Sequence, residues 1–337
     1  MKTLLTQPLS PVSNKIHSHK AAQGIIYADQ IKNAGYDLTV HMTGNQLHDY
    51  NAYELVALYH GNDWGGSLNL FGGLENYANI EYIIALSNFR GKVWSLVIDM
   101  PDYHGMLYPR YEKAKKEEKK LNRLWDSVNW AGLKDIQDRA ETVDPNLLKR
   151  YDKITIGDSH AICMYRPGWM NVSTPFKTLH GAINMGFESF IPEGNYTEIE
   201  TYFGNIDVRH HLMRQEDPSS AAIGLAQRYI DECKRISDKY GAKVTIWELL
   251  PIENECRILP KTGYYKGTPF YGTWAERNDI RTKFNDYVKA NYGIYEWTSR
   301  LLNFYGELDF EAMEKPKSVH LSRASYPHWQ GAEWNEK

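Results

Sequence analysis

Residues 154–161 read Ile154-Thr-Ile-Gly157-Asp158-Ser159-His160-Ala161, and this stretch decides the fold of the region around it. A short apolar run gives way to helix-compatible sequence at the Gly-Asp-Ser turn, which predicts a strand followed by a helix. The N–H groups of a first helical turn have no partner inside the helix and can hold a developing negative charge. Ser159 is therefore expected at the C-terminal edge of a sheet, where a catalytic serine would be effective.

An ordered series of motifs follows this turn. An extended segment ends in the run Tyr202-Phe-Gly204-Asn205-Ile206-Asp207-Val-Arg209-His-His211. Beyond it the pattern predicts a helix over 221–239, a strand over 243–247 and a second helix over 277–290. The chain then reaches Lys317-Ser-Val-His320-Leu-Ser322, which places a histidine in the last of these motifs.

The order Gly-Asp-Ser, Gly-x-x-Asp and Val-His-Leu-Ser resembles the SGNH/GDSL family of serine hydrolases and acyltransferases. The resemblance covers about residues 151–330 and implies a flavodoxin-like, doubly wound parallel sheet. It further implies that Ser159 is the nucleophile and His320 its general base. An imidazole suits this role because it titrates near neutral pH and can remove the proton that makes a serine hydroxyl a poor nucleophile.

The same resemblance implies an oxyanion hole built from the N–H groups of Ser159 and Gly181 and from a third block that begins at Gly204. We therefore expect a group of residues to form the oxyanion-binding or substrate-binding part of the site. They are Asp158, His160, Gly181, Gly204, Asn205, Asp207 and Arg209.

Two positions depart from the family pattern. Ile206 occupies the asparagine position of the third block and cannot donate a hydrogen bond, and the loss of one oxyanion donor typically costs about 100- to 1000-fold in rate. Lys317 stands where the family carries an aspartate, three residues before the histidine. Either a backbone carbonyl or a nearby acid then orients His320 in a serine–histidine dyad, or the site serves another chemistry. The nearby acids are Asp309, Glu311 and Glu314.

Asp207 and Arg209 form a further candidate pair. They lie two positions apart, so their side chains would share one face if the segment were extended. This spacing predicts a buried ion pair, or an anion clamp aimed into the same site.

Residues 1–140 are expected to form a separate domain, joined by a linker over 141–150 to a second domain over 151–330, with a tail over 331–337. The first domain carries a predicted helix over 21–34 and predicted strands over 37–41, 54–59 and 91–98. Strands that alternate with helices predict a mostly parallel, doubly wound sheet. The expected fold class is therefore α/β, with two doubly wound parallel-sheet domains, the first Rossmann-like and the second SGNH-like.

Within the first domain, Ser67-Leu-Asn-Leu-Phe71-Gly72-Gly73 and a strand that ends in Asp99 are similar to the N-terminal, GT-B-like domain of phage DNA β-glucosyltransferases. This resemblance covers roughly residues 30–110. It implies that Asp99 is the base that activates an acceptor hydroxyl on a modified pyrimidine. Asp99 would then face a cleft between the two domains, because open α/β sheets bind ligands at the carboxyl ends of their strands.

Charge and cysteine usage limit the binding partners and the cellular compartment that the sequence allows. The net charge of −3 excludes a global basic field that recruits nucleic acid, so any contact with DNA would be a local patch. The three cysteines, Cys163, Cys233 and Cys256, have no metal-ligand spacing and indicate reduced thiols. The apolar part of residues 1–8 is too short for a signal peptide, and no apolar run approaches 18 residues. We expect a cytoplasmic protein, in the host cytoplasm if the chain is viral, with no metal, no cofactor and no membrane contact.

These features predict an enzyme, a serine-dependent acyl ester hydrolase or acyltransferase that acts on a carbohydrate or nucleoside hydroxyl. Its partner would be a small-molecule or carbohydrate acyl substrate, and modified DNA is a second candidate acceptor. One alternative is a phage-type transferase that modifies hydroxymethylated pyrimidines in DNA, with Asp99 as its base. A second alternative, suggested by Ile206 and Lys317, is a non-catalytic protein that binds a sugar or a nucleotide.

Overall fold

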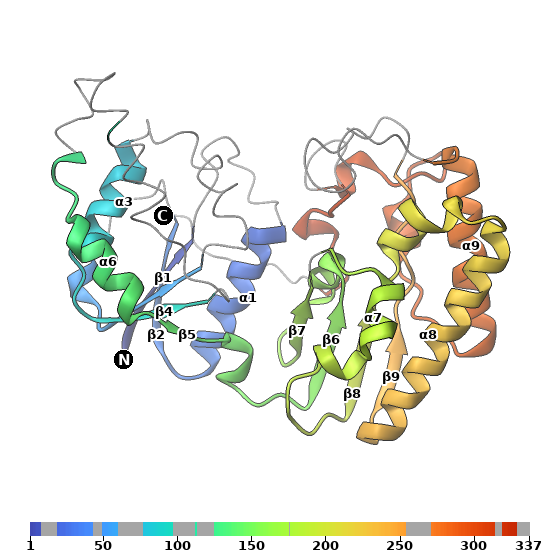
Figure 1. The fold of residues 1–337 in the computed structure, drawn as a ribbon, viewed down its shortest axis with the longest axis horizontal. Helices are drawn as coiled ribbons and strands as arrows, with labels where there is room; N and C mark the ends of the chain where they lie inside the picture. The colour runs from blue at the N-terminus through green and yellow to red at the C-terminus, as the bar shows by residue number, and fades with distance from the viewer. Residues whose placement is uncertain are drawn as a thin grey trace. The chain divides into compact units, whose positions relative to one another are not determined.

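The computed structural model describes residues 1–7, 19–42, 49–59, 77–96, 112, 125–174, 176–253, 271–313 and 319–328. The chain forms two compact units, one of Met1–Ile16 with Lys20–Lys149 and one of His17–His19 with Arg150–Lys337. Each unit contains a parallel sheet accompanied by helices (Figure 1). The predicted mixed α/β class with two parallel sheets is thus confirmed, and it is consistent with a Rossmann-like fold.

The N-terminal unit is built on a five-stranded sheet in the order β2-β1-β3-β4-β5. All four strand pairs are parallel. The strands are β1 (Lys2–Gln7), β2 (Asp37–Met42), β3 (Leu55–Leu58), β4 (Lys92–Ser95) and β5 (Glu141–Thr142). Strand β3 is buried along its whole length, as expected for a continuous apolar run in a parallel sheet.

The described helices of this unit accompany the sheet. They are α1 (His19–Asn33), η1 (Tyr50–Ala52), α3 (Tyr77–Ser87), α6 (Trp130–Arg139) and η2 (Pro145–Leu147). Gly132 allows α6 to approach α3, because a Cβ at this position would collide with the Ser87 carbonyl oxygen. A hydrophobic core joins β1, β3 and β4 with α3 and α6, and its members include Leu4, Val56, Phe89 and Trp125.

One strand of this unit was not expected from the sequence, and one expectation needs correction. Residues 2–7, for which no strand was expected, form β1 in the interior of the sheet. Glu141 and Thr142, assigned to a linker, pair with β4 as the edge strand β5. Asp99 and Ser67–Gly73 lie outside the described residues.

The C-terminal unit is built on a four-stranded parallel sheet in the order β7-β6-β8-β9. Its strands are β6 (Lys153–Gly157), β7 (Met170–Ser173), β8 (Glu198–Tyr202) and β9 (Lys243–Ile246). Beyond β9, Trp247 forms an isolated parallel bridge with Tyr295. Tyr295 therefore extends the strand order by one position.

Helices and short helical turns lie between these strands and after the last of them. The longer helices are α7 (Leu179–Met185), α8 (Pro218–Tyr240) and α9 (Trp274–Asn291). The short ones before α8 are η3 (Ser159–Met164), η4 (Phe187–Phe190), η5 (Asp207–His211) and η6 (Leu212–Arg214). Those after α9 are η7 (Thr298–Leu301), η8 (Phe310–Ala312) and η9 (Arg323–Ser325).

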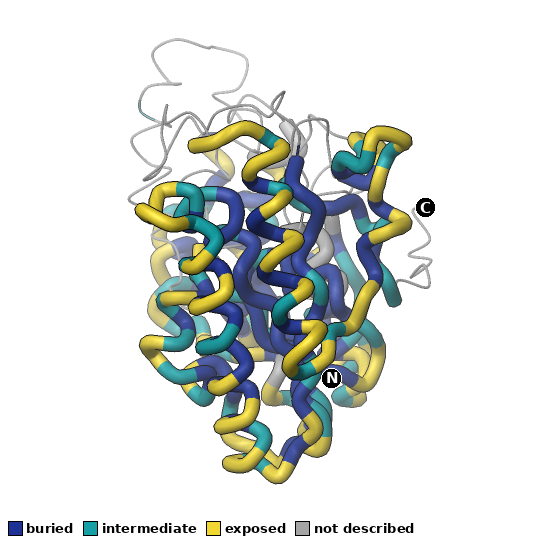
Figure 2. The backbone as a smooth tube through the Cα atoms, turned by 90° about the vertical axis from the view of Figure 1, so that its right-hand side faces the viewer, coloured by how far each residue is buried: buried dark blue, intermediate teal, exposed yellow. Residues whose placement is uncertain are grey.

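Helix α8 has clear start and stop signals. Asp217 caps it by accepting a hydrogen bond from the Ser220 N–H, Pro218 occupies the first turn, and Gly241 ends it with a left-handed φ of 62°. Helices α8 and α9 pack side by side, and buried and exposed stretches alternate along the helices nearest the viewer in Figure 2. Within the described part of the chain, none of the helices combines the length and apolar character needed to cross a bilayer.

Candidate active site

Strand β6 delivers Ser159 to the carboxyl edge of its sheet. The strand ends at Gly157, where a Cβ would collide with the Tyr202 carbonyl oxygen of β8 and with the Ala161 side chain, so only glycine fits. Asp158 then caps η3 and accepts a hydrogen bond from the His160 N–H at 2.8 Å. Ser159 is the first residue of η3, and its own N–H has no acceptor inside that turn.

The structure brings Ser159 and His320 together. The Ser159 Oγ lies 3.2 Å from the His320 Nε2 although 161 positions separate the two residues in the sequence. The segment that carries His320 is tied back to the unit, because Leu321 bridges Met313 and the Ser322 N–H donates to the Ala312 carbonyl. Both side chains of the pair are only partly buried. This geometry permits proton transfer from the hydroxyl to the imidazole.

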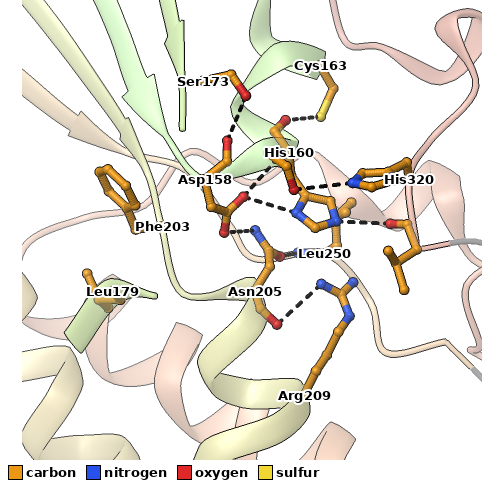
Figure 3. Close-up of polar contacts among 12 residues, drawn as sticks. Asp158, His160, Cys163, Ser173, Leu179, Phe203, Asn205, Arg209, Leu250 and His320 are labelled. Atoms are coloured by element: carbon orange, nitrogen blue, oxygen red, sulfur yellow. Dashed lines mark hydrogen bonds and ion pairs between the residues drawn. The ribbon is translucent and has the colours of Figure 1, made fainter. Parts of the chain in front are cut away.

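His160 lies beside this pair with its ring buried. Its Nδ1 is 3.0 Å from the Asp158 Oδ1, and its Nε2 is 3.0 Å from the Val319 carbonyl oxygen (Figure 3). The side chains of His160 and Asp158 are 4% and 0% exposed. Burial lowers the pKa of the His160 ring, against the opposing effect of the Asp158 carboxylate. Both ring nitrogens have protein partners, so the predicted contact of His160 and Asp158 with substrate or oxyanion is not what the structure shows.

Asn205 connects the ends of three strands, and Gly204 forms the turn before it. Gly204 adopts a φ of +118°, and a Cβ there would lie 3.3 Å from the Leu249 side chain. The Asn205 side chain donates to the Asp158 Oδ2 at 3.4 Å and accepts from the Leu250 N–H at 3.0 Å. Both of these Asn205 contacts are made to protein groups. Asn205 therefore joins the turns that follow β6 and β9 to its own position after β8.

Gly181 lies in the first turn of α7. Its N–H donates to the Thr178 Oγ1 at 3.0 Å and so completes the cap of this helix. This is a different role from the predicted oxyanion donor, because the hydrogen already has an acceptor. Ile206 immediately precedes η5 with helical backbone angles.

The predicted ion pair between Asp207 and Arg209 is wrong. Residues 207–211 form a π-helical turn rather than an extended segment, and side chains two positions apart on a helix do not face each other. Asp207 instead accepts from the Leu179 N–H at 2.7 Å and the His180 N–H at 3.3 Å, at the start of α7. Arg209 binds Glu253, with 2.6 Å between its Nε and the Oε2.

The partner of Arg209 was missed at the sequence level. The Arg209 and Glu253 side chains are 2% and 1% exposed, and Arg209 also donates to the Asn205 carbonyl at 3.3 Å. Glu253 follows the strand predicted over 243–247, so its place beyond the carboxyl end of β9 was the available signal. The pair holds the turns after β8 and β9 together.

We expect Glu253→Gln to lower the free energy of unfolding by about 3–5 kcal/mol, since the Arg209 guanidinium would stay buried without its anionic partner. Urea denaturation followed by circular dichroism measures the loss. The matched control is Glu296→Gln, which breaks the exposed 2.8 Å pair with Lys289 and should leave the urea midpoint nearly unchanged. Equal losses in the two variants would show that the buried Arg209–Glu253 pair stabilises the fold no more than the exposed Lys289–Glu296 pair does.

Burial raises the pKa of Asp207 from 3.8 to about 6, against the backbone N–H groups of Leu179 and His180, which lower it. An acid whose pKa is higher in the folded state binds more protons there, so its contribution to stability declines as the pH rises from 4 to 6. A shift of about two pKa units corresponds to roughly 3 kcal/mol. The difference in unfolding free energy between the wild type and Asp207→Asn should therefore fall by about this amount between pH 4 and 7. A difference that stays constant with pH would contradict the raised pKa.

The remaining candidate residues are the possible metal ligands, the cysteines and the acids near His320. Among the described residues, no three His, Cys, Asp or Glu side chains converge in a way that could hold a metal ion. Cys163 and Cys233 are buried free thiols, and Cys256 lies outside the described residues together with Glu314 and Lys317. The Asp309 carboxylate caps η8 by accepting from the Glu311 N–H at 2.9 Å.

The sequence matches no protein-family model, and no curated protein matches it. Three solved structures are similar in part. A proposed platelet activating factor from Streptococcus pneumonia is 13% identical, with a TM-score of 0.38, over 66% of this chain and 90% of that one. The OSK domain of Drosophila Oskar is 15% identical, with a TM-score of 0.34, over 53% of this chain and 84% of that one. A gut microbial diltiazem-metabolizing enzyme is 12% identical, with a TM-score of 0.30, over 45% of this chain and 38% of that one.

Proposed function

We propose that the C-terminal unit is an SGNH-like serine acyl ester hydrolase or acyltransferase. The observation that carries the proposal is the 3.2 Å approach of the Ser159 Oγ to the His320 Nε2. A hydroxyl this close to an imidazole can lose its proton as it attacks, which is the requirement for nucleophilic catalysis by serine.

The topology of the unit supports the same function. The order β7-β6-β8-β9 places the second strand of the unit on one side of the first and the third strand on the other. Open α/β sheets bind ligands at the carboxyl ends of the two strands where the order reverses in this way. Ser159 follows β6 and Gly204 follows β8, so both lie at that edge.

The reaction would proceed in two steps. In the first step, Ser159 Oγ attacks the acyl carbonyl while its proton passes to His320 Nε2, and His320 then protonates the departing alcohol. In the second step, water or the hydroxyl of an acceptor loses its proton to His320 and attacks the acyl-serine. His320 then returns that proton to the departing Ser159 Oγ, and the carboxylic acid or the new ester is released. We propose a carbohydrate or nucleoside hydroxyl as the acceptor in a transferase.

Oxyanion stabilisation would come chiefly from the N–H of Ser159 at the start of η3. The Gly181 N–H is engaged by Thr178, one N–H of the Asn205 side-chain amide is engaged by Asp158, and the Ile206 side chain offers no donor. Each missing donor lowers the rate by about 100- to 1000-fold in serine hydrolases. We therefore expect slow turnover of simple esters, and faster turnover where the substrate contributes its own hydrogen bonds.

A fluorophosphonate probe tests the proposal directly. Attack by the Ser159 Oγ on phosphorus forms a P–O bond and releases fluoride, while His320 takes the hydroxyl proton. Mass spectrometry of the full chain should show one adduct, and peptide mapping should place it on Ser159. The adduct should be absent in protein unfolded by urea before the probe is added. An intact folded protein that acquires no adduct would exclude an activated serine.

A further inference from the structure

His160 connects the nucleophile turn to the segment that carries the base. Its ring spans from the Asp158 carboxylate on one side to the Val319 carbonyl on the other, at 3.0 Å in each case. Val319 immediately precedes His320, so this contact reaches the backbone of the base itself. The two imidazole rings also pack together, with centroids 5.0 Å apart and planes inclined by 34° (Figure 3).

The anchor of this connection is firmly held. The Asp158 N–H donates to the Tyr202 carbonyl at 3.0 Å, and the Asp158 carbonyl accepts from the Ser173 Oγ at 3.0 Å. The Asp158 carboxylate accepts from the Asn205 side chain and from the His160 N–H. Asp158 is thereby bonded to β8, β7 and the turn after β8. A ring held by Asp158 is therefore fixed relative to the sheet.

The contacts of the His160 ring also define which ring nitrogen carries a hydrogen. A carbonyl oxygen can only accept a hydrogen bond, so the contact with Val319 requires a hydrogen on Nε2. Nδ1 faces the Asp158 Oδ1 at 3.0 Å. His160 thus acts as a donor toward the His320 segment and is not available as a second base for Ser159.

We infer that His160 is a positioning residue that holds the Val319–His320 backbone in place and so keeps the His320 Nε2 at the Ser159 Oγ. The inference rests on the proposed function in that His320 is the base. An acid three residues before the base would otherwise help to orient it, but this chain has Lys317 at that position. The buried His160 then performs part of this orienting task.

Two conservative substitutions of His160 test its contacts with Asp158 and Val319 separately. The Gln side chain can place an amide N–H near the position of Nε2, and so His160→Gln keeps a donor for the Val319 carbonyl. The Asn side chain reaches only as far as Nδ1, and so His160→Asn keeps a contact with Asp158 but cannot reach Val319. The two variants have similar polarity, which makes each the control for the other.

We expect His160→Asn to lower kcat by about 100-fold with KM nearly unchanged, because a misplacement of about 1 Å costs this much in a catalytic group. His160→Gln should retain kcat within about tenfold of the wild type. Hydrogen–deuterium exchange, which needs no activity, should show faster exchange of the amides of residues 319–322 in the Asn variant than in the Gln variant. The substrate is p-nitrophenyl acetate.

Three results would overturn the inference. They are wild-type kcat in both variants, equal losses in both, or equal exchange of residues 319–322 in all three proteins. Failure of the proposed function gives a different pattern. In that case the wild type forms no fluorophosphonate adduct on Ser159 and hydrolyses no ester, while exchange of residues 319–322 still distinguishes Asn from Gln and so supports the positioning role.

Discussion

Ser159→Ala should lower ester hydrolysis or acyl transfer by about 10⁴- to 10⁶-fold, as removal of the nucleophile does in serine hydrolases. The fold should be unaffected, because the hydroxyl is partly exposed and its hydrogen bond is made to His320 rather than to the core. The rate of p-nitrophenyl acetate hydrolysis and fluorophosphonate labelling measure the loss.

The matched control for this substitution is Ser189→Ala. The Ser189 hydroxyl is exposed in η4 and donates to the Met185 carbonyl at 2.9 Å, away from Ser159 and His320. Its removal should leave fluorophosphonate labelling of Ser159 intact. A wild-type rate in Ser159→Ala would exclude Ser159 as the nucleophile, whatever the behaviour of the control.

His320→Ala should lose about as much activity as Ser159→Ala, since the members of a catalytic unit fail together. Without the imidazole, the serine proton has no acceptor at 3.2 Å. The pH dependence adds a second readout: any residual rate should rise with hydroxide concentration instead of levelling off as an imidazole titrates. A loss of tenfold or less would show that His320 is not the base.

The strands and helices that the sequence predicts best are those with long apolar periodicity. The helices expected over 221–239 and 277–290 correspond to α8 and α9, and the strand expected over 243–247 corresponds to β9. Strand β1 was missed because its two leucines, Leu4 and Leu5, are too short an apolar run to distinguish a strand from a loop. Strand β7 was missed for the same reason, since Met170–Ser173 carries only two apolar residues.

The site was predictable where its motifs are local and unpredictable where it depends on tertiary contacts. Ser159 and His320 were found from short motifs, and the structure places them in hydrogen-bonding distance. The contact of Arg209 with Glu253 depends on how two turns meet, and no sequence period encodes that meeting. The expected partnership of Asp207 with Arg209 failed because the spacing of two positions was interpreted as extended backbone, whereas the chain after Gly204 turns into a helix.

The distance of 161 residues between Ser159 and His320 has a consequence for the nascent protein. Synthesis at roughly 5–20 residues per second would separate the emergence of the serine from that of its base by about 10–30 s. Throughout that interval Ser159 lacks the His320 imidazole, which is its proposed base. Under the proposed function, catalysis would therefore begin only after residues 319–328 have been made and have docked.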